Sequence, residues 1–310
     1  MNTTQDFSLR RQFIDTLQAQ RAFTRLKEVR QDTLRSRTSK GLLLQGPSGV
    51  GKTTLIQEFI SATFQGGFVP GKRCAAIRVE IPSSPSKKNL ATAVLLALGD
   101  PFATSRRHSA EAKFQRIVKL LEILEVELVI LDEAQHLIDY KRATTYEAAD
   151  WIKSLLNATR STFVLVGLPR TEQLLWANEQ LRRRFSASVL YDRLRWDSRE
   201  DQNEFAALVN AIGGILPVPT VNLVTDPMLH RLHHASYGLI DYLIKILDRA
   251  VWLVSQGRGR GIDLEVLANA FRDEVWSQAP SHRNPFATEF DFAPLIGKHE
   301  PFELFDNPEA

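Results

Sequence analysis

One eight-residue stretch, Gly46-Pro47-Ser48-Gly49-Val50-Gly51-Lys52-Thr53, constrains the fold of this chain more than any other. The apolar run 41–45 before it predicts a buried strand, and the run 55–60 after it predicts a helix. A glycine-rich turn that joins a strand to a Lys-Thr pair at a helix start is typical of a phosphate-binding P-loop. The glycines let backbone N–H groups point at phosphate oxygens, and the helix N-terminus adds partial positive charge. A chance glycine-rich turn is the alternative.

The motif predicts a role for each of its polar residues. We expect Lys52 to reach the β- and γ-phosphates of ATP and the Thr53 hydroxyl to bind Mg²⁺. The nucleotide should contact the loop, the first helical residues and one acid from a later strand. These expected cofactor-binding residues are Gly46, Pro47, Ser48, Gly49, Val50, Gly51, Lys52, Thr53, Thr54 and Asp132.

A second motif, Leu128-Val129-Ile130-Leu131-Asp132-Glu133, supplies that acid. Four apolar residues that end in two acids predict a buried parallel strand whose carboxyl end faces the nucleotide. Asp132 matches the Walker B aspartate and is expected to hold the Mg²⁺ shell together with Thr53. Glu133 is placed to orient or deprotonate the attacking water and is the expected catalytic base. Many strands end in acids, so this motif indicates a nucleotide site only because a P-loop precedes it.

Strand-like and helix-like segments alternate from Gly41 to Tyr191, which predicts an α/β domain with a parallel sheet flanked by helices. Ser198 and Asp201 form a capping pair that starts a helix to about Ile212, and Gly213-Gly214 and Pro217–Pro219 separate it from the next helices. Three further helical stretches are predicted at about 226–235, 239–256 and 262–277. We therefore divide the chain into a basic helical segment (1–40), a nucleotide-binding core (41–195), a helical lid (196–277) and an extended tail (278–310).

The two ends of the chain each leave two interpretations open. The basic N-terminal helix either packs on the nucleotide domain or also contacts DNA or a neighbouring subunit. The tail carries several aromatic residues among acids, so it either lies on its own domain or docks on a partner.

Composition narrows the class of protein. The chain of 310 residues is 44% hydrophobic and 24% charged, as is usual for a soluble globular protein. The sequence has no apolar run near the roughly 20 residues of a membrane helix. It has one cysteine, Cys74, so an intrachain disulfide is impossible and a cytoplasmic location is expected. A net charge of +3 permits a polyanion as partner without requiring one.

The motifs together resemble an AAA+ ATPase, and more narrowly the TniB/TnsC family of ATP-dependent transposition regulators. The resemblance covers about residues 10–280. It lies in the P-loop, in Val-Ile-Leu-Asp-Glu-Ala-Gln-His-Leu (129–137), in Val-Leu-Val-Gly-Leu-Pro (164–169) and in Leu-Arg-Arg-Arg-Phe (181–185). It implies a homo-oligomer on duplex DNA, a ring or filament of roughly six or seven subunits per turn. Such a protein links a TniQ-like target-selection protein to the transposase, and ATP hydrolysis disassembles the oligomer.

The resemblance also assigns residues. Arg184, directly before Phe185, matches the arginine finger that enters a neighbour's site, and Arg182 or Arg183 could fill that role instead. Two positions depart from the family pattern, because Leu168 stands at the polar sensor-1 position and Tyr242 at the sensor-2 arginine. Lys245, one helical turn on, is a possible substitute for that arginine. Both departures predict slow hydrolysis, stimulated by DNA or by partners.

DNA contact should be sequence-independent and made through phosphates. Arg106 and Arg107, in a basic loop before the Walker B strand, are the expected DNA-binding residues, and Lys113 and Arg116 are weaker candidates. A solvated basic loop is the alternative.

Two other functions stay open: a nucleotide-switched scaffold, and an AAA+ ATPase of a secretion or anti-phage system that does not act on DNA. His230, His233 and His234 are expected to be structural.

Overall fold

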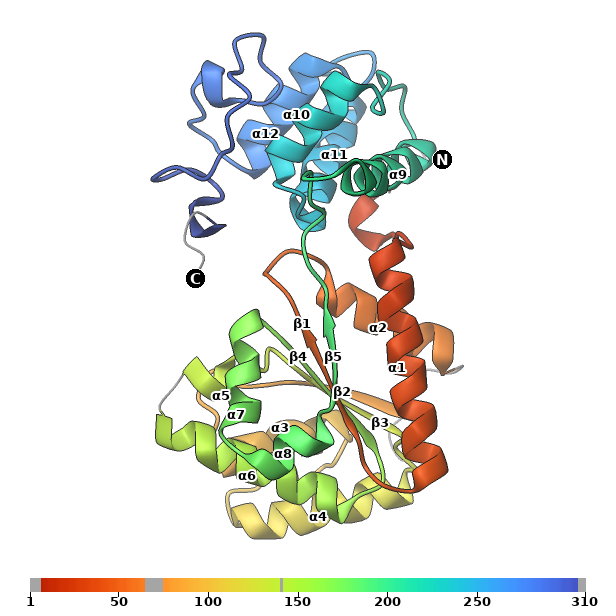
Figure 1. Cartoon of the computed structure of the whole chain (residues 1–310), viewed down its shortest axis with the longest axis vertical. Coiled ribbons are helices and arrows are strands. Elements are labelled where there is room, and N and C mark those ends of the chain that lie inside the picture. The colour runs from red at the N-terminus through yellow and green to blue at the C-terminus, as the bar shows by residue number, and fades with distance from the viewer. Residues whose placement is uncertain (1–6, 65–74, 140–141, 306–310) are drawn as a thin grey trace. The chain divides into compact units, whose positions relative to one another are not determined.

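The computed structural model describes residues 7–64, 75–139 and 142–305 (Figure 1). Residues 1–6 of the N-terminal segment, Cys74 and the last five residues of the tail lie outside the described part. The chain divides into two compact units. Unit 2 comprises residues 18–48 and 52–192, and unit 1 comprises residues 1–17, 49–51 and 193–310. The predicted N-terminal segment thus contributes residues to both units.

Unit 2 is built on a five-stranded parallel sheet, which confirms the predicted α/β fold. The strand order is β2-β3-β4-β1-β5, so the chain crosses from β1 to β2 and returns through β3 and β4. The carboxyl ends of β1 and β3, which carry the two predicted motifs, lie at the same edge of the sheet. The strands are β1 (Gly41–Gln45), β2 (Ala76–Glu80), β3 (Leu128–Asp132), β4 (Thr162–Gly167) and β5 (Ala187–Leu190).

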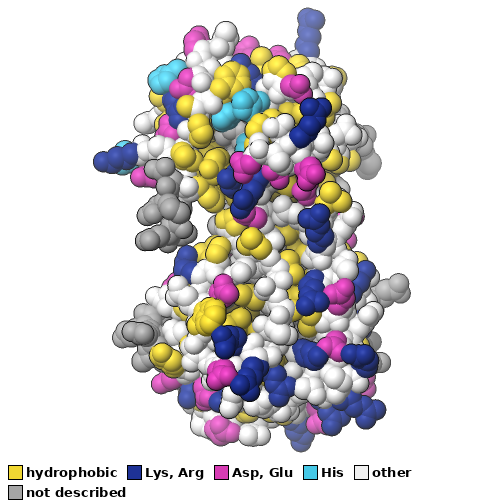
Figure 2. Space-filling model, viewed as in Figure 1, with side chains coloured by type: hydrophobic (Ala, Val, Ile, Leu, Met, Phe, Trp, Pro, Cys, Tyr) yellow, Lys and Arg dark blue, Asp and Glu magenta, His cyan; other side chains and the backbone are white. Residues whose placement is uncertain are grey.

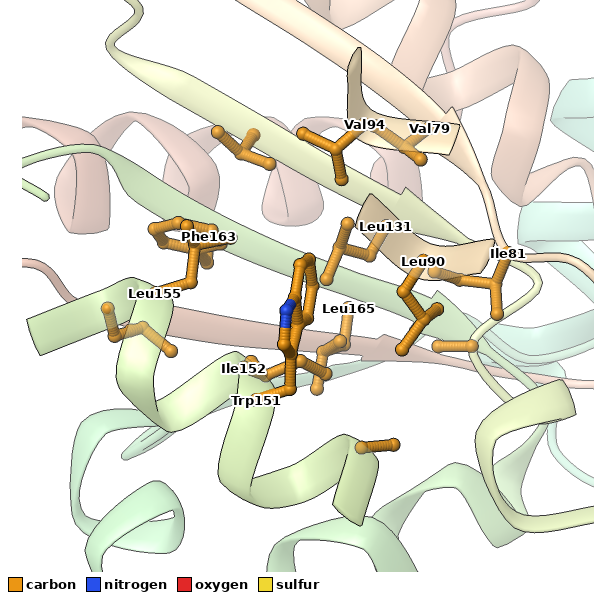
Figure 3. Packing of buried hydrophobic residues seen from close by; sticks show 14 of the residues in the cluster. Val79, Ile81, Leu90, Val94, Leu131, Trp151, Ile152, Leu155, Phe163 and Leu165 are labelled. Atoms are coloured by element: carbon orange, nitrogen blue, oxygen red, sulfur yellow. The ribbon is translucent and has the colours of Figure 1, made fainter. Parts of the chain in front are cut away.

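Helices cover both faces of this sheet (Figure 1). On one face, α3 (Lys87–Ala97), α4 (Ala110–Ile123) and α6 (Arg142–Ala158) pack over strand residues such as Leu131 and Leu165. Figure 3 shows Trp151 and Ile152 of α6 beside these strands. On the other face, α1 (Leu17–Ser36) and α2 (Lys52–Thr63) meet through Phe23 and Phe59, whose rings lie 5.5 Å apart. Short helices complete the unit: α5 (His136–Asp139), η2 (Pro169–Glu172), α7 (Gln173–Trp176) and α8 (Glu179–Arg184).

Burial of both sheet faces explains the apolar strands. Every residue of β3 and β4 is buried, including Asp132 and Thr162. The polar side of α1 is solvated instead: Figure 2 shows Lys and Arg side chains among Asp and Glu side chains where α1 lies. Two of its arginines pair within the helix, Arg25 with Glu28 and Arg35 with Asp32, while Arg30 pairs with Glu127. These contacts are those of an ordinary charged helix surface.

Unit 1 contains the predicted helical lid as four helices: α9 (Arg199–Ile215), α10 (Asp226–Ser236), α11 (Ile240–Ser255) and α12 (Leu264–Glu274). The capping box of Ser198 and Asp201 is present at the start of α9. The prediction that Gly213-Gly214 ends this helix is wrong, because α9 continues to Ile215. Glycine can adopt helical backbone angles, so Gly213 and Gly214 stay in the helix. The helix ends because Leu216, the residue before Pro217, takes an extended conformation (φ −66°, ψ 131°).

Residues 7–17 and the described part of the tail belong to unit 1. The turn η1 (Leu9–Arg11) lies on α11, where the Leu9 N–H donates to Asp248 at 2.5 Å. The tail has little regular structure beyond the turns η3 (Ser281–Arg283) and η4 (Glu303–Phe305). Three of its rings, Phe286, Phe290 and Phe302, are at most 5% exposed, so they belong to the packing of their own unit.

Candidate functional site

The P-loop follows β1 as predicted. Gly46 stays tied to the sheet, because its N–H donates to the Gly167 carbonyl at 3.2 Å. Gly49 and Gly51 then take φ values of +81° and +91°, which side chains other than glycine rarely adopt. α2 begins directly at Lys52. The two glycines therefore supply the turn that aims the loop at the N-terminus of α2, where an anionic phosphate is favoured.

Lys52 lies inside the curve of its own loop. Its Nζ donates to the carbonyls of Gly46 and Pro47, both at 2.8 Å. Burial lowers the pKa of Lys52 to about 8, and the carboxylates of Glu133 and Asp132 oppose that shift. The ammonium thus lies near two acids, and the two carbonyls that accept its hydrogen bonds could be replaced by phosphate oxygens.

Asp132 and Thr53 meet at the carboxyl edge of the sheet. The Thr53 hydroxyl donates to Asp132 Oδ2 at 3.0 Å, and the Asp132 side chain is almost fully buried. One hydroxyl and one carboxylate are the two protein oxygens that P-loop proteins offer to Mg²⁺, with phosphates and waters completing the shell. These residues therefore fit a magnesium ion. The metal would neutralise charge on the phosphates.

Arg78 of β2 belongs to the same cluster and was missed from the sequence. Its guanidinium contacts Asp132 Oδ2 through Nε at 2.9 Å and through Nη2 at 2.8 Å. The position is explained by the pairing of β2 with β3, which sets Glu80 beside Asp132. Arg78 alternates with the buried Ile77 and Val79. A charged residue between two apolar residues of a predicted strand was the sequence signal that could have identified Arg78.

Glu133 follows Asp132 with a left-handed backbone (φ +57°). Its N–H donates to Asp132 Oδ1 at 2.9 Å, and its carboxylate accepts a hydrogen bond from the Gln135 side chain. Gln135 is buried, and its Oε1 in turn accepts from the Leu168 N–H at 3.3 Å. Glu133 and Leu168 were singled out from the sequence, whereas Gln135, which bonds to both, was missed.

Comparison with known proteins decides the family. A model of the bacterial TniB protein family matches residues 6–198, which is more than half of the chain. The chain belongs to the TniB family. No curated protein matches the sequence.

Solved structures with the same fold are distant in sequence. The Aeropyrum pernix ORC1 protein, solved in complex with DNA, is 15% identical, with a TM-score of 0.60 over 84% of this chain and 66% of that one. The Aeropyrum pernix ORC2 protein, in ADPNP–ADP complexes, is 16% identical, with a TM-score of 0.59 over 84% and 68%. Cdc6p from Pyrobaculum aerophilum is 13% identical, with a TM-score of 0.64 over 86% and 72%. This chain thus spans about two thirds of the length of these structures.

The family and the geometry agree on the chemistry. This TniB protein is an AAA+ ATPase with a parallel P-loop core and a helical C-terminal region. It binds a nucleotide, and Lys52 and the turn before it are the groups placed to hold phosphates. Glu133 and Asp132 adjoin that loop.

Arg184 lies far from this P-loop within its own unit. At the end of α8, its guanidinium donates to the Ser39 carbonyl and to Asn157 Oδ1, each at 3.2 Å. Ser39 precedes β1, so Arg184 lies at the amino edge of the sheet, about 15 Å of strand from the carboxyl edge. Arg182 stacks over Trp176 at 4.9 Å, and Arg183 pairs with Glu179. Arg184 is therefore not placed to act on the nucleotide held by its own P-loop.

The four residues predicted to contact DNA, in and after the basic loop before α4, fall into two groups. Arg106 and Arg107 are exposed. Lys113 is 2% exposed, and its Nζ donates to the Ala103 carbonyl at 2.5 Å, so the prediction that it contacts DNA is wrong. Arg116 is held by the buried carboxylate of Asp100. The spacing of residues along α4 does not by itself indicate that the Lys113 side chain is buried.

The two departures from the family pattern are occupied by packing residues. Leu168 opens η2 in unit 2. In unit 1, Tyr242 meets the Phe302 ring edge-on at 5.2 Å, and Lys245 lies over the Tyr242 ring while pairing with Asp241 at 2.5 Å.

Within the described residues, no helix is both long and apolar enough to cross a bilayer. Those residues likewise hold no group of three or more His, Cys, Asp or Glu side chains suited to a metal ion.

Proposed function

We propose that this protein is an ATP-dependent, DNA-binding, oligomeric regulator of transposition that acts in the cytoplasm. ATP binding assembles copies along duplex DNA, the oligomer links a TniQ-like target-selection protein to the transposase, and hydrolysis disassembles it. The membership of the TniB family is the single observation that carries this proposal.

The basic loop supports the DNA part of the proposal. Arg106 and Arg107 are exposed neighbours, while Asp100, Arg116 and Lys113 hold the loop in place from behind. Two arginines on an ordered loop can contact phosphates without reading bases. The ORC1 structure with the same fold was solved in complex with DNA.

The proposal assigns the nucleotide contacts as predicted: Gly46 to Thr54 around the phosphates, and Thr53 with Asp132 at Mg²⁺. Glu133 acts as the base, and Arg184 acts in the site of a neighbouring copy. Apolar Leu168 and the packed Tyr242 support slow turnover that DNA or partners raise, and they also favour the competing function of a nucleotide-switched scaffold.

Fluorescence anisotropy on a labelled random duplex tests the proposal, with ATP, ADP and a non-hydrolysable analogue. We expect binding with ATP and the analogue, weak binding with ADP, and no preference among sequences. Replacing Arg106 and Arg107 together with Ala should lower the slope of log affinity against log salt concentration by about 2, because two phosphate contacts are lost.

A matched variant, Arg258→Ala with Arg260→Ala, removes the same charge from an exposed loop of unit 1 and should leave that slope unchanged. ATP-dependent assembly without any duplex binding would instead establish the scaffold function.

A further inference from the structure

Gln135 joins the two parts of the site that the family pattern would connect through a polar side chain at Leu168. Its amide has one donor end and one acceptor end, and both are used. The Leu168 N–H can only donate, and the Glu133 carboxylate can only accept. The two partners therefore fix the amide orientation, with Oε1 toward Leu168 and Nε2 toward Glu133.

The surrounding backbone is shaped around this amide. The Ala134 N–H donates to the Val166 carbonyl at 2.8 Å, which ties the Walker B turn to the end of β4. A Cβ on Gly167 would clash first with Thr171 Oγ1, and it would lie 2.8 Å from Gln135 Oε1 and 3.2 Å from the Gln135 backbone nitrogen. Gly167 therefore leaves room that the Thr171 and Gln135 side chains share.

The same residues connect Gln135 to the phosphate loop. The Gly167 carbonyl accepts from the Gly46 N–H, at the first residue of that loop. A continuous set of contacts thus runs from Gly46 through Gly167 and Leu168 to Gln135 and then to Glu133. Each of these contacts is within unit 2.

We infer that Gln135 is a positioning residue for hydrolysis: it holds the Glu133 carboxylate and takes the place of the missing polar side chain at Leu168. By occupying Oε2 it leaves Oε1 as the oxygen that faces away from the amide and toward a water. Because Glu133 already has a left-handed backbone, this hydrogen bond also limits which rotamers its side chain adopts. The inference rests on the ATPase site and not on DNA binding.

Two variants test the inference in single-turnover hydrolysis of labelled ATP by the full chain. Gln135→Leu should lower the rate constant at saturating ATP at least about tenfold, with nucleotide affinity within about twofold of the wild type. Gln135→Glu is nearly isosteric and sets a second carboxylate beside Glu133. An ionised carboxylate cannot donate to Glu133, so this variant should lower the rate constant as Gln135→Leu does.

The split between rate and affinity separates this role from a packing role. Gln135→Glu keeps the size of the side chain and removes the donor to Glu133, so the rate constant should fall while the nucleotide still binds. The matched variant Gln115→Glu, which faces Glu111 on the exposed side of α4, should leave the rate constant unchanged.

Unchanged rate constants in both Gln135 variants would overturn the inference. So would a Gln135→Leu variant that lost nucleotide affinity and rate in equal proportion, since Gln135 would then serve binding. A failure of DNA binding would leave these measurements untouched.

Discussion

Lys52 makes nucleotide binding sensitive to pH at the scale of one residue. Its pKa is lowered to about 8 by burial, so above pH 8 the free protein holds a largely neutral amine. Phosphate oxygens favour the ammonium, so binding above pH 8 must take up a proton. We expect ATP affinity to fall by up to about tenfold per pH unit above 8.

Isothermal titration calorimetry in two buffers of different ionisation enthalpy measures that proton directly. At pH 9 the wild type should take up close to one proton per nucleotide. Lys52→Arg is the control, because arginine stays charged over the whole range and should take up none. Equal heats in both buffers for the wild type would contradict the prediction.

Residues adjacent in the sequence were identified from it, and residues that meet only through the sheet were not. Lys52, Thr53, Asp132 and Glu133 stand in short motifs whose local geometry follows from strand, turn and helix. The role of Arg78 depends on the register between β2 and β3, which a single sequence does not specify. Lys113 was misassigned because lysine is rarely buried, and nothing in its spacing indicates the Ala103 carbonyl that accepts its ammonium.

The effect of replacing a glycine within a helix or strand depends on the atoms that surround it, as Gly41 and Gly214 show. A Cβ on Gly41, in β1, would lie 2.5 Å from Cε1 of the buried Phe185 ring, whereas one on Gly214, in α9, would meet no atom within 4 Å. Gly41→Ala should therefore destabilise the protein by about 1–3 kcal/mol through overpacking. Gly214→Ala should stabilise it by about 0.5–1 kcal/mol through helix propensity and a less disordered unfolded chain.

Urea unfolding of both variants beside the wild type measures these differences, and each variant controls for the other. Equal effects of the same sign would contradict the account. β1 lies where the apolar run 41–45 predicts it, whereas α9 continues past the predicted end near Ile212 and through Gly213-Gly214. Whether a glycine ends a helix depends on the residues that follow it, here Pro217.

The histidine cluster of α10 makes unit 1 sensitive to acid. Burial lowers the pKa values of His233 and His234 to about 4, and nearby Arg193 and Arg283 add to that effect, while Asp197 and Asp291 oppose it. The unfolded chain binds protons near pH 6.5, so stability is complete above that pH and is lost as the pH falls from 6.5 toward 4. Between pH 7 and pH 5 we expect a loss of about 2 kcal/mol per histidine.

Denaturant titrations at the two pH values test this expectation. His234→Gln should remove about half of the pH dependence, because one of the two buried histidines is gone. The variant can also be less stable at both pH values, because His230 Nε2 loses its contact with His234 Nε2. His282→Gln, at an exposed position, is the control. A wild-type stability equal at pH 5 and pH 7 would show that the cluster opens without unfolding.

At the scale of the whole molecule, the distance between Arg184 and its own P-loop predicts complementation between inactive variants. Lys52→Ala keeps an intact arginine, and Arg184→Ala keeps an intact phosphate loop. An equal mixture should recover about a quarter of the wild-type rate, since one interface in four joins the two intact parts. ATP hydrolysis by each variant alone and by the mixture is the measurement, and no recovery in mixed oligomers would contradict a role in a neighbouring site.

The contacts of Arg283 determine how the C-terminal segment could be used. Its guanidinium donates to Glu300 at 2.6 and 2.7 Å, to Asp291 at 2.9 Å, and to the carbonyls of Ala293 and Pro294. One side chain therefore anchors both limbs of the loop from Asp291 to Glu300. Any protein that recruited this loop as a ligand would first have to separate Glu300 from Arg283, and so would lose two charge-assisted hydrogen bonds before gaining one.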